Sequence, residues 1–455
     1  MLSRGIVARN ILRTNIFSIL KSEPNIRLVI FVPEGMPDDF RNDFVGDNVI
    51  FEETPDVEYS SFRKRLFTAV MQKTVYTDTA KFMMRYGGRV TKKDKAFIFY
   101  ILGHIGATII SNLPLLKSLF RFLEFNLFPD NDFDKYFEKY NPNLVVSTII
   151  KAKRDIAILK SAKRFNVPNI SMARSWDNLD RILIAIKPDK LMVQNEIMQE
   201  LAISLHGMKK EDVEVVGFPQ FDLYQDPNTF YDKDEFLNNL GLDKNKKTLF
   251  FASEGVWAPY GPHVVSMLKE MIDNNELIEP CQLIIRPHYS DTLEFSDYTV
   301  FKNIKGVYLD QTMKKRNFFT DKWDASFEQM KHLANELYHA DILITYATTL
   351  SIEASILDTP VININFMVPG EPKHTPYLGM YYKSSHYSNI VRAGGVDLVD
   401  SREALRNRIN EYLKNSNIKH QERVYTAKLL TYKLDGKSGE RVANFILQFL
   451  NKENK

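Results

Sequence analysis

The chain repeatedly alternates short apolar runs with longer amphipathic stretches, and this alternation constrains its fold more than any other feature. The first half contains the runs IRLVIFVPE, LVVSTI, DKLMVQN and VEVVGF, and the second half contains TLFFAS, CQLIIRPH, DILITYA and VININF. Helix-like stretches separate most of these runs. Strands that alternate with helices of about 10–15 residues indicate βαβ units and a parallel sheet. The sequence therefore predicts two α/β domains of similar size.

The domain boundaries follow from a change in amino-acid composition after Asp222. Residues 223–247 are polar, charged and turn-rich, which is typical of a linker between domains. We expect a Rossmann-like domain over 1–222 with a helical apolar insertion at about 60–140, and a second Rossmann-like domain over 248–418. The stretch 419–455 is expected to be helical and to pack back on the N-terminal domain. Two such domains imply a cleft, and ligands bind outside the carboxyl ends of the strands.

Composition excludes several classes of protein. The chain has 455 residues and a formal net charge of +3, which is too small to indicate nucleic-acid binding. Its one cysteine, Cys281, allows neither an internal disulfide nor a cysteine metal cluster, and this suits a reducing cytosol. The N-terminal stretch lacks the apolar core and cleavage site of a signal peptide. These features favour a cytoplasmic globular protein.

Residues 96–116, AFIFYILGHIGATIISNLPLL, contain no Asp, Glu, Lys or Arg. A run of this length is a candidate membrane span. His104, Asn112 and Pro114, together with two glycines, argue against a span. Two other interpretations stay open: helices buried within a domain, or a surface that contacts the inner leaflet of the membrane.

Hydroxyl side chains follow the apolar run DILITYA. Thr348, Thr349 and Ser351 stand at the start of a predicted helix, where unpaired N–H groups and a partial positive charge can hold a phosphate. Glu353 lies four residues beyond Thr349, on the same helix face. A carboxylate there suits a ribose diol, as in dinucleotide sites. The pattern predicts a diphosphate at the hydroxyls and a ribose at Glu353; a plain threonine cap with a solvent-facing glutamate would fit as well.

Two other runs of the second half also end in polar residues. LIIRPHY ends in Arg286 and His288, which are suited to phosphate contact or proton transfer, although a surface arginine and a structural histidine are equally compatible. TLFFASEG ends at Ser253 and Glu254, where a first strand–helix loop would approach a ligand. A simple turn at the following glycine is the alternative for that loop.

In the first half, the stretch ISMARSWDNLDR places polar residues after a predicted strand. Trp176 could stack on a sugar ring, and Asp177 could remove a hydroxyl proton; an Asx-type turn is the alternative. The chain contains no Walker A, G-x-G-x-x-G or G-x-S-x-G motif. Its D-x-D pairs lie in polar stretches rather than at strand ends, so no metal ligand is predicted.

Taken in order, SWDN, PDKLMVQNEIMQELAISLHG, VEVVGFPQFD, RPH and ADILITYATTLSIEASILDTPVI resemble the GT-B glycosyltransferase superfamily. More narrowly, the chain is similar to bacterial surface-carbohydrate transferases related to CDP-glycerol glycerophosphotransferases and to UDP-N-acetylglucosamine 2-epimerase-like proteins. The resemblance spans about 140 to 400. It implies a nucleotide-linked donor on the second domain, contact of His288 with the donor phosphate or leaving nucleotide, and no metal or other cofactor.

We therefore expect a cytoplasmic glycosyltransferase, peripheral on the inner face of the membrane, that helps to build a capsule or other surface polysaccharide. Its donor would be a nucleotide sugar and its acceptor a glycan or lipid-linked glycan, with Asp177 as the base and the 96–116 region docking a lipid-linked acceptor. Glycerophosphate transfer from CDP-glycerol, sugar-nucleotide 2-epimerisation, and a degenerate, non-catalytic partner in a glycan assembly complex are the alternatives.

Overall fold

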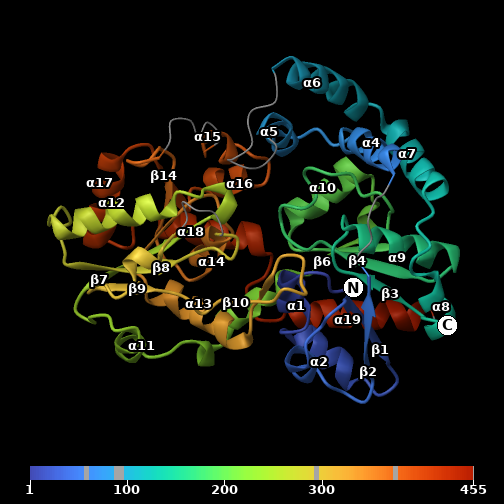
Figure 1. The fold of residues 1–455 in the computed structure, drawn as a ribbon, viewed down its shortest axis with the longest axis horizontal. Coiled ribbons are helices and arrows are strands. Elements are labelled where there is room, and N and C mark those ends of the chain that lie inside the picture. The colour runs from blue at the N-terminus through green and yellow to red at the C-terminus, as the bar shows by residue number, and fades with distance from the viewer. Residues whose placement is uncertain (56–60, 87–96, 292–296, 372–377, 454–455) are drawn as a thin grey trace.

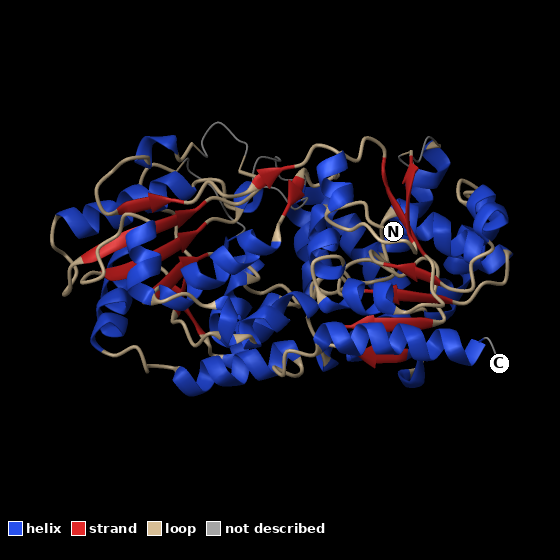
Figure 2. Ribbon diagram, turned by 90° about the horizontal axis from the view of Figure 1, so that it is seen from below, coloured by secondary structure: helices blue, strands red, loops and turns tan. Residues whose placement is uncertain are grey.

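The computed structural model describes residues 1–55, 61–86, 97–291, 297–371 and 378–453. The chain forms two α/β lobes that lie side by side (Figure 1, Figure 2). We call the lobe that holds the strands up to Val215 the N-terminal lobe, and the lobe that holds the strands from Lys247 onward the C-terminal lobe. The predicted pair of α/β units is therefore present, with helices on the faces of both sheets.

The C-terminal lobe is built on a six-stranded parallel sheet of order β14-β13-β12-β7-β8-β9. Its strands are β7 (Lys247–Ala252), β8 (Cys281–Arg286), β9 (Val307–Leu309), β12 (Ile342–Thr345), β13 (Val361–Ile364) and β14 (Val396–Val399). The central strands are apolar without alternation because helices cover both faces. These helices are α11 (Lys233–Asn239), α12 (Gly261–Asp273), α13 (Phe327–His339), α14 (Leu350–Ile356), α15 (Leu378–Tyr381), α16 (Tyr387–Ala393), α17 (Arg402–Lys414) and α18 (His420–Thr431).

The N-terminal lobe carries a four-stranded parallel sheet of order β3-β4-β5-β6 and a separate parallel pair, β1-β2. The strands are β1 (Leu28–Pro33), β2 (Val49–Thr54), β3 (Val145–Ser147), β4 (Asn169–Met172), β5 (Lys190–Val193) and β6 (Val213–Val215). Helices α1 (Gly5–Ile11), α2 (Asn15–Ser22), α3 (Asp38–Asn42), α8 (Asp134–Tyr140), α9 (Lys153–Arg164) and α10 (Glu196–His206) surround them. A short antiparallel pair, β10 (Lys314–Lys315) and β11 (Trp323–Asp324), contacts α1 from the C-terminal half of the chain.

The described residues of the insertion in the N-terminal lobe form the helices α4 (Phe62–Gln72), α5 (Asp78–Tyr86), α6 (Phe97–Ser111) and α7 (Pro114–Leu127). Helices α6 and α7 lie along the outer edge of the molecule, at the upper right of Figure 1. The described part of the apolar stretch, 97–116, falls on these two helices and on the two residues between them. Within the described residues, no helix combines the length and apolar character needed to cross a bilayer.

The last helix, α19 (Ser438–Glu453), leaves the C-terminal lobe and packs on the N-terminal one. Val442, Ile446 and Phe449 join a buried cluster with Ile16 of α2 and with the four-stranded sheet (Figure 1). The chain also passes between the lobes after β6, where it forms short 3-10 turns at 219–225 and 227–229. The two lobes are thus tied together by two crossings of the chain.

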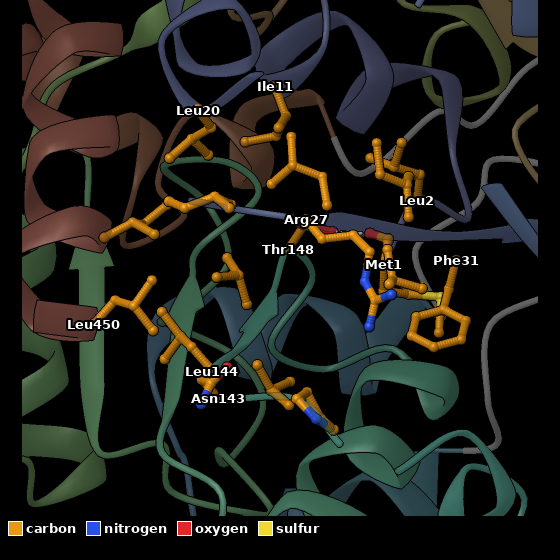
Figure 3. A pocket seen from close by; sticks show the side chains of 18 of the residues that line it. Met1, Leu2, Ile11, Leu20, Arg27, Phe31, Asn143, Leu144, Thr148 and Leu450 are labelled. Atoms are coloured by element: carbon orange, nitrogen blue, oxygen red, sulfur yellow. Dashed lines mark hydrogen bonds between the residues drawn. The ribbon is translucent and has the colours of Figure 1, made fainter. Parts of the chain in front are cut away.

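An apolar cavity of about 390 Å³ lies inside the N-terminal lobe, between β1 and β3 and beside α2 and α19 (Figure 3). Aliphatic and aromatic side chains such as Phe31 and Leu144 form most of its wall. Arg27, Thr148, and asparagines such as Asn143 are among the polar residues of the lining. The described lining contains no carboxylate and no histidine side chain.

Candidate active site between the lobes

The residues predicted at the strand ends of both lobes meet in the space between the lobes. The indole Nε1 of Trp176, after β4, donates a hydrogen bond to Thr349 Oγ1, after β12, at 3.2 Å. Asp177 lies close enough to Glu254 that its charge affects the pKa of that carboxyl group. The carboxyl ends of β4, β7, β8 and β12 therefore face one another, as expected for a ligand cleft in an α/β protein.

The turn after β12 presents two of its three predicted hydroxyls to this region. Thr348 Oγ1 accepts a hydrogen bond from the backbone N–H of Leu350 at 3.1 Å, and Thr349 receives the tryptophan N–H. Ser351 differs because it is fully buried and its Oγ pairs with Tyr387 Oη at 2.8 Å. Its hydroxyl joins α14 to α16, so Thr348 and Thr349 are better placed than Ser351 to meet a ligand.

Glu353 is buried on α14 and accepts a hydrogen bond from the hydroxyl of Tyr224, in the chain segment that joins the lobes. Burial raises the pKa of Glu353, while the positive charge of Arg9 and the Tyr224 hydrogen bond oppose that rise. The solvent-facing glutamate that the sequence also allowed is therefore wrong. A buried carboxylate with a charged neighbour from the other lobe fits a site that is covered on several sides.

Arg286 stands at the end of β8 and is held by two buried carboxylates. Its Nη1 donates to Glu336 Oε2 at 2.7 Å and also to Asp310. Burial would lower the pKa of Arg286, but these two negative charges outweigh it and raise the pKa. The guanidinium is thus fixed beside the cleft by its own partners, and the alternative of a free surface arginine is excluded.

Asp310, His332 and Glu336 carry ligand atoms that lie within 4.8 Å of one another, a spacing that a metal ion could use. The guanidinium of Arg286 already bonds to both carboxylates, however, and its positive charge disfavours a cation between them. The chemistry of this cluster fits the support of Arg286 better than it fits a metal centre.

His288 presents a neutral imidazole with a defined tautomer. Burial and the charge of Arg286 lower the pKa of His288 to about 4. Its Nδ1 accepts the backbone N–H of Ser290 at 3.2 Å and lies 2.7 Å from the Ser290 hydroxyl. Because Nδ1 is an acceptor, the proton of the neutral ring sits on Nε2. His288 is therefore suited to donate a hydrogen bond to an anionic ligand at neutral pH.

The two residues predicted in the loop after β7, Ser253 and Glu254, lie in different environments. Ser253 is buried, donates to Asp291, and accepts the backbone N–H of His288 at 2.8 Å. Its hydroxyl thus fixes the His288 loop. Gly255 has a φ of +64°, and a Cβ there would lie 2.6 Å from His288 Nδ1, so only glycine allows this approach.

The carboxyl group of Glu254 has no hydrogen bond to any described residue, and Glu254 borders a small cavity beside Trp257, Tyr346 and Tyr381. Burial, and then the negative charges of Asp291 and Asp177, raise the pKa of Glu254 well above its usual value. A protonated carboxyl group facing the cleft can donate a hydrogen bond or a proton, which an ionised one cannot.

The pKa of Asp177 is shifted in the opposite direction to that of Glu254. Burial alone would raise its pKa, but the positive charges of Arg181 and Lys151 dominate and hold the pKa of Asp177 far below the usual range. The carboxylate pairs with Arg181 and accepts from Asn178 Nδ2 at 2.6 Å. A carboxylate that binds protons so weakly is a poor general base, because proton acceptance improves as the pKa approaches the working pH.

Several residues of the cleft did not emerge from sequence reasoning. Lys151 follows β3 just as Asp177 follows β4, and burial together with Arg181 lowers the pKa of Lys151 to about 7. Arg174 and Arg181 flank the Asp177 turn. The sequence signal that could have identified these three residues is their position directly after a strand. Asp180, which lies 2.9 Å from Nδ1 of His386, was not singled out either.

Three solved structures are similar to the chain, and the first of them supports the fold. The S. aureus MnaA–UDP co-structure aligns with 98% of this chain and 94% of its own, at 11% identity and a TM-score of 0.54. The wall teichoic acid polymerase TagF aligns with 75% of this chain and 98% of its own, at 12% identity and a TM-score of 0.42. The Methanocaldococcus jannaschii UDP-GlcNAc 2-epimerase in complex with UDP-GlcNAc and UDP covers 69% of this chain and 78% of its own, at 15% identity and a TM-score of 0.44. The two lobes are of the GT-B type.

Comparison of sequences gives a more specific result. No curated protein matches the chain. The family model of CDP-glycerol:poly(glycerophosphate) glycerophosphotransferase matches residues 161–448, which include the polar turn at Asp177, the RPH segment and the turn after β12. This match covers more than half of the chain and confirms the predicted relationship. The protein therefore belongs to the CDP-glycerol:poly(glycerophosphate) glycerophosphotransferase family and is a transferase that uses nucleotide-linked donors.

Proposed function

We propose that the protein transfers a sugar from a nucleotide-sugar donor to a surface-polysaccharide or lipid-linked glycan acceptor, without a metal ion. The observation that supports this proposal is that polar turns at the strand ends of both lobes lie close together in one cleft. The C-terminal lobe contributes the Thr348–Thr349 turn and the neutral imidazole of His288. The N-terminal lobe contributes the Trp176–Asp177 turn opposite them.

The donor would bind to the C-terminal lobe, with its diphosphate at Thr348 and Thr349 and its ribose near Glu353. Negative charge grows on the departing nucleotide during transfer. A hydrogen bond from His288 and the nearby charge of Arg286 would stabilise that charge. Preorganised donors of this kind act without a bound cation, which supports a metal-independent reaction.

Glycerophosphate transfer from CDP-glycerol is the second candidate, and the family match favours it. The same donor site would serve, but the attacked atom would be phosphorus instead of the anomeric carbon. The two reactions differ in the nucleotide they release. Sugar transfer releases a nucleoside diphosphate, whereas glycerophosphate transfer releases CMP.

This difference gives the test. The purified protein is incubated with CDP-glycerol, UDP-N-acetylglucosamine or UDP-glucose and with bacterial membranes as acceptor, and the released nucleotide is identified by chromatography. Acceptor-dependent release of a nucleoside diphosphate supports sugar transfer. Release of CMP alone supports glycerophosphate transfer, and no release from any donor contradicts both.

The acceptor side includes an exposed apolar surface on the insertion, which we call the α6–α7 surface. It consists of Leu102, Ile105, Ile109, Leu113, Leu115, Leu119, Phe122 and Leu127, all of them substantially exposed. An exposed apolar patch of this extent is typical of a protein or membrane contact. We infer that it rests on the inner face of the membrane and brings the cleft to a lipid-linked acceptor.

A further inference from the structure

The apolar cavity of the N-terminal lobe lies where the sheet of that lobe is interrupted. Among the described strands, β1 pairs with β2 and β3 pairs with β4, but no hydrogen bonds join β1 to β3. The cavity of about 390 Å³ occupies the space between them (Figure 3). Protein interiors are close-packed and hold few voids larger than a water molecule. A cavity of this size is within the range of small-molecule sites and therefore indicates a ligand.

Residues near the N-terminus bridge the gap between β1 and β3 at one end of the cavity. The backbone N–H of Leu2 donates to the carbonyl of Phe31 in β1 at 2.7 Å. The hydroxyl of Thr148, directly after β3, donates to the carbonyl of Met1. None of the residues that form the candidate active site lines the cavity. The cavity is thus separate from the cleft between the lobes.

Exposed polar residues lie at the other end, where β1 and β3 begin. Asn25 and Arg27 come just before β1, and Asn141 and Asn143 come just before β3. All four line the cavity and all four are exposed to solvent. Solvent therefore reaches the cavity at the amino ends of these strands, and a ligand can enter there.

Arg27 gives this entrance a positive charge. Within the part of the chain that the structure describes, its guanidinium forms no hydrogen bond and no ion pair. The described lining contains no carboxylate that could neutralise it. A guanidinium is a planar group that binds a carboxylate through two parallel hydrogen bonds. The entrance therefore favours a ligand with an anionic head group.

The interior of the cavity favours an aliphatic tail. Leu144, Ile158 and Ile446 are among the side chains that surround it. Cavities lined by such side chains stay dry, and one of about 150 Å³ takes up benzene. At about 30 Å³ per chain carbon, the volume that liquid water gives to one molecule, the cavity holds on the order of a dozen carbons. This space suits one acyl chain and not the two chains of a phospholipid.

We propose that this cavity binds a fatty acid, with the acyl chain between β1 and β3 and the carboxylate at Arg27. The inference goes beyond the proposed transferase function, because the site lies apart from the cleft and takes neither the donor nor the acceptor. An apolar interior, one open end and an unpaired cation at that end together match the two parts of such an amphiphile.

The ligand would also contact the helix that ties the two lobes together. Helix α19 contributes Val442, Ile446 and Leu450 to the lining. At its start, the backbone N–H of Ser438 donates to Asp222 Oδ1, in the segment that joins the lobes, at 3.0 Å. An acyl chain packed against α19 adds apolar contacts to this connection. Binding is therefore expected to stabilise the folded protein.

Binding is tested on the full-length protein after bound lipid has been washed away. The fluorescent fatty acid cis-parinaric acid should bind saturably, palmitate should displace it, and palmitate should raise the melting temperature by mass action. Absence of saturable binding would overturn the proposal. Displacement by lysophosphatidic acid or by an extended apolar peptide, but not by palmitate, would assign the cavity to another ligand and would overturn it as well.

The role of the charge is tested by Arg27→Gln. Loss of a hydrogen-bonded charge pair should weaken palmitate binding about tenfold or more. Binding of cetyl alcohol, which has the same chain length and no charge, should not change. Arg65 is exposed on α4 outside the cavity, and Arg65→Gln is the control that keeps the affinity for both ligands. An unchanged palmitate affinity in Arg27→Gln would contradict the assigned head-group site.

The position of the chain is tested by filling the cavity. Leu144→Trp places an indole in the interior and should abolish binding of both ligands, with the melting temperature showing that the variant is folded. Leu450→Trp fills the cavity from α19 and serves if the first variant does not fold. The double variant Leu115→Ser with Phe122→Ser alters only the α6–α7 surface and should bind normally. Binding that is lost in the double variant and kept in the tryptophan variants would overturn the proposal. No arm of this test involves a nucleotide, so its failure and that of the transferase function are distinguishable.

Discussion

Hydroxyl groups that the sequence places at the cleft serve different purposes once the chain is folded. Ser253 and Ser351 are buried, so their donors and acceptors must be satisfied within the protein, and they bond to Asp291 and Tyr387. Thr348 and Thr349 lie at the turn that faces the other lobe. The position after a strand was therefore predictable from sequence. The direction in which each hydroxyl points was not, because it depends on partners far away in the chain.

Glu254 supplies a prediction about pH. Because burial raises its folded-state pKa above the unfolded value of about 4.3, the folded protein binds this proton more tightly than the unfolded chain does. Stability from this group is thus present at low pH and is lost as pH rises through the folded-state pKa. Glu254→Gln should melt at the same temperature as the unaltered protein near pH 4, and at an increasingly higher temperature toward pH 8. An unchanged difference across this range, measured by calorimetry, would contradict the assigned environment.

Arg286 supplies a prediction about stability. Its removal leaves the buried carboxylates of Asp310 and Glu336 without their cation. Breaking one side of such a buried pair costs about 3–5 kcal/mol, so Arg286→Ala should lower the free energy of unfolding by that amount in urea titrations. Arg402 pairs with Glu276 at the surface, and Arg402→Ala should cost no more than about 1 kcal/mol. Equal costs for both variants would show that the Arg286 cluster is not a buried charge network.

At the scale of elements, the strands of the C-terminal lobe were visible in the sequence because β7, β8, β12 and β13 are apolar runs bounded by polar turns. Strand β1 lies in the apolar run IRLVIFVPE, but its partner β2 and the short β10-β11 hairpin gave no such signal. Their pairing depends on long-range contacts, such as that of α1 with β11. The stretch 96–116 was ambiguous because composition cannot distinguish a buried helix from an exposed apolar helix.

The α6–α7 surface yields a prediction at this scale. Leu115 is 85% exposed and Phe122 is 64% exposed. Replacing both by serine removes apolar area from the surface without opening the core, so the protein should stay folded but bind less to vesicles of anionic phospholipid in flotation assays. Tyr425, which is 56% exposed on α18, is the control, and Tyr425→Ser should leave vesicle binding unchanged. Equal binding by the double variant would exclude this surface as the contact.

At the scale of the whole molecule, the cleft is assembled from parts that neither lobe contains alone. Glu353 of the C-terminal lobe meets Tyr224 of the connecting segment and the charge of Arg9 from α1. Asp180 and His386 are 206 positions apart in the chain. Sequence spacing predicted which strand ends carry polar side chains, but only the docking of the lobes decides which of these residues touch.

The most direct test of the account is a thermal-shift measurement with UDP, CDP, GDP, CMP, CDP-glycerol and the common UDP-sugars. A ligand that binds the folded state raises its melting temperature by mass action. The account predicts that one nucleotide class raises the melting temperature. This rise should be lost in Glu353→Ala. Glu235→Ala, a substitution on the exposed face of α11, is the control and should keep the rise. No rise with any nucleotide, from protein shown to be folded, would contradict a nucleotide-donor site between the lobes.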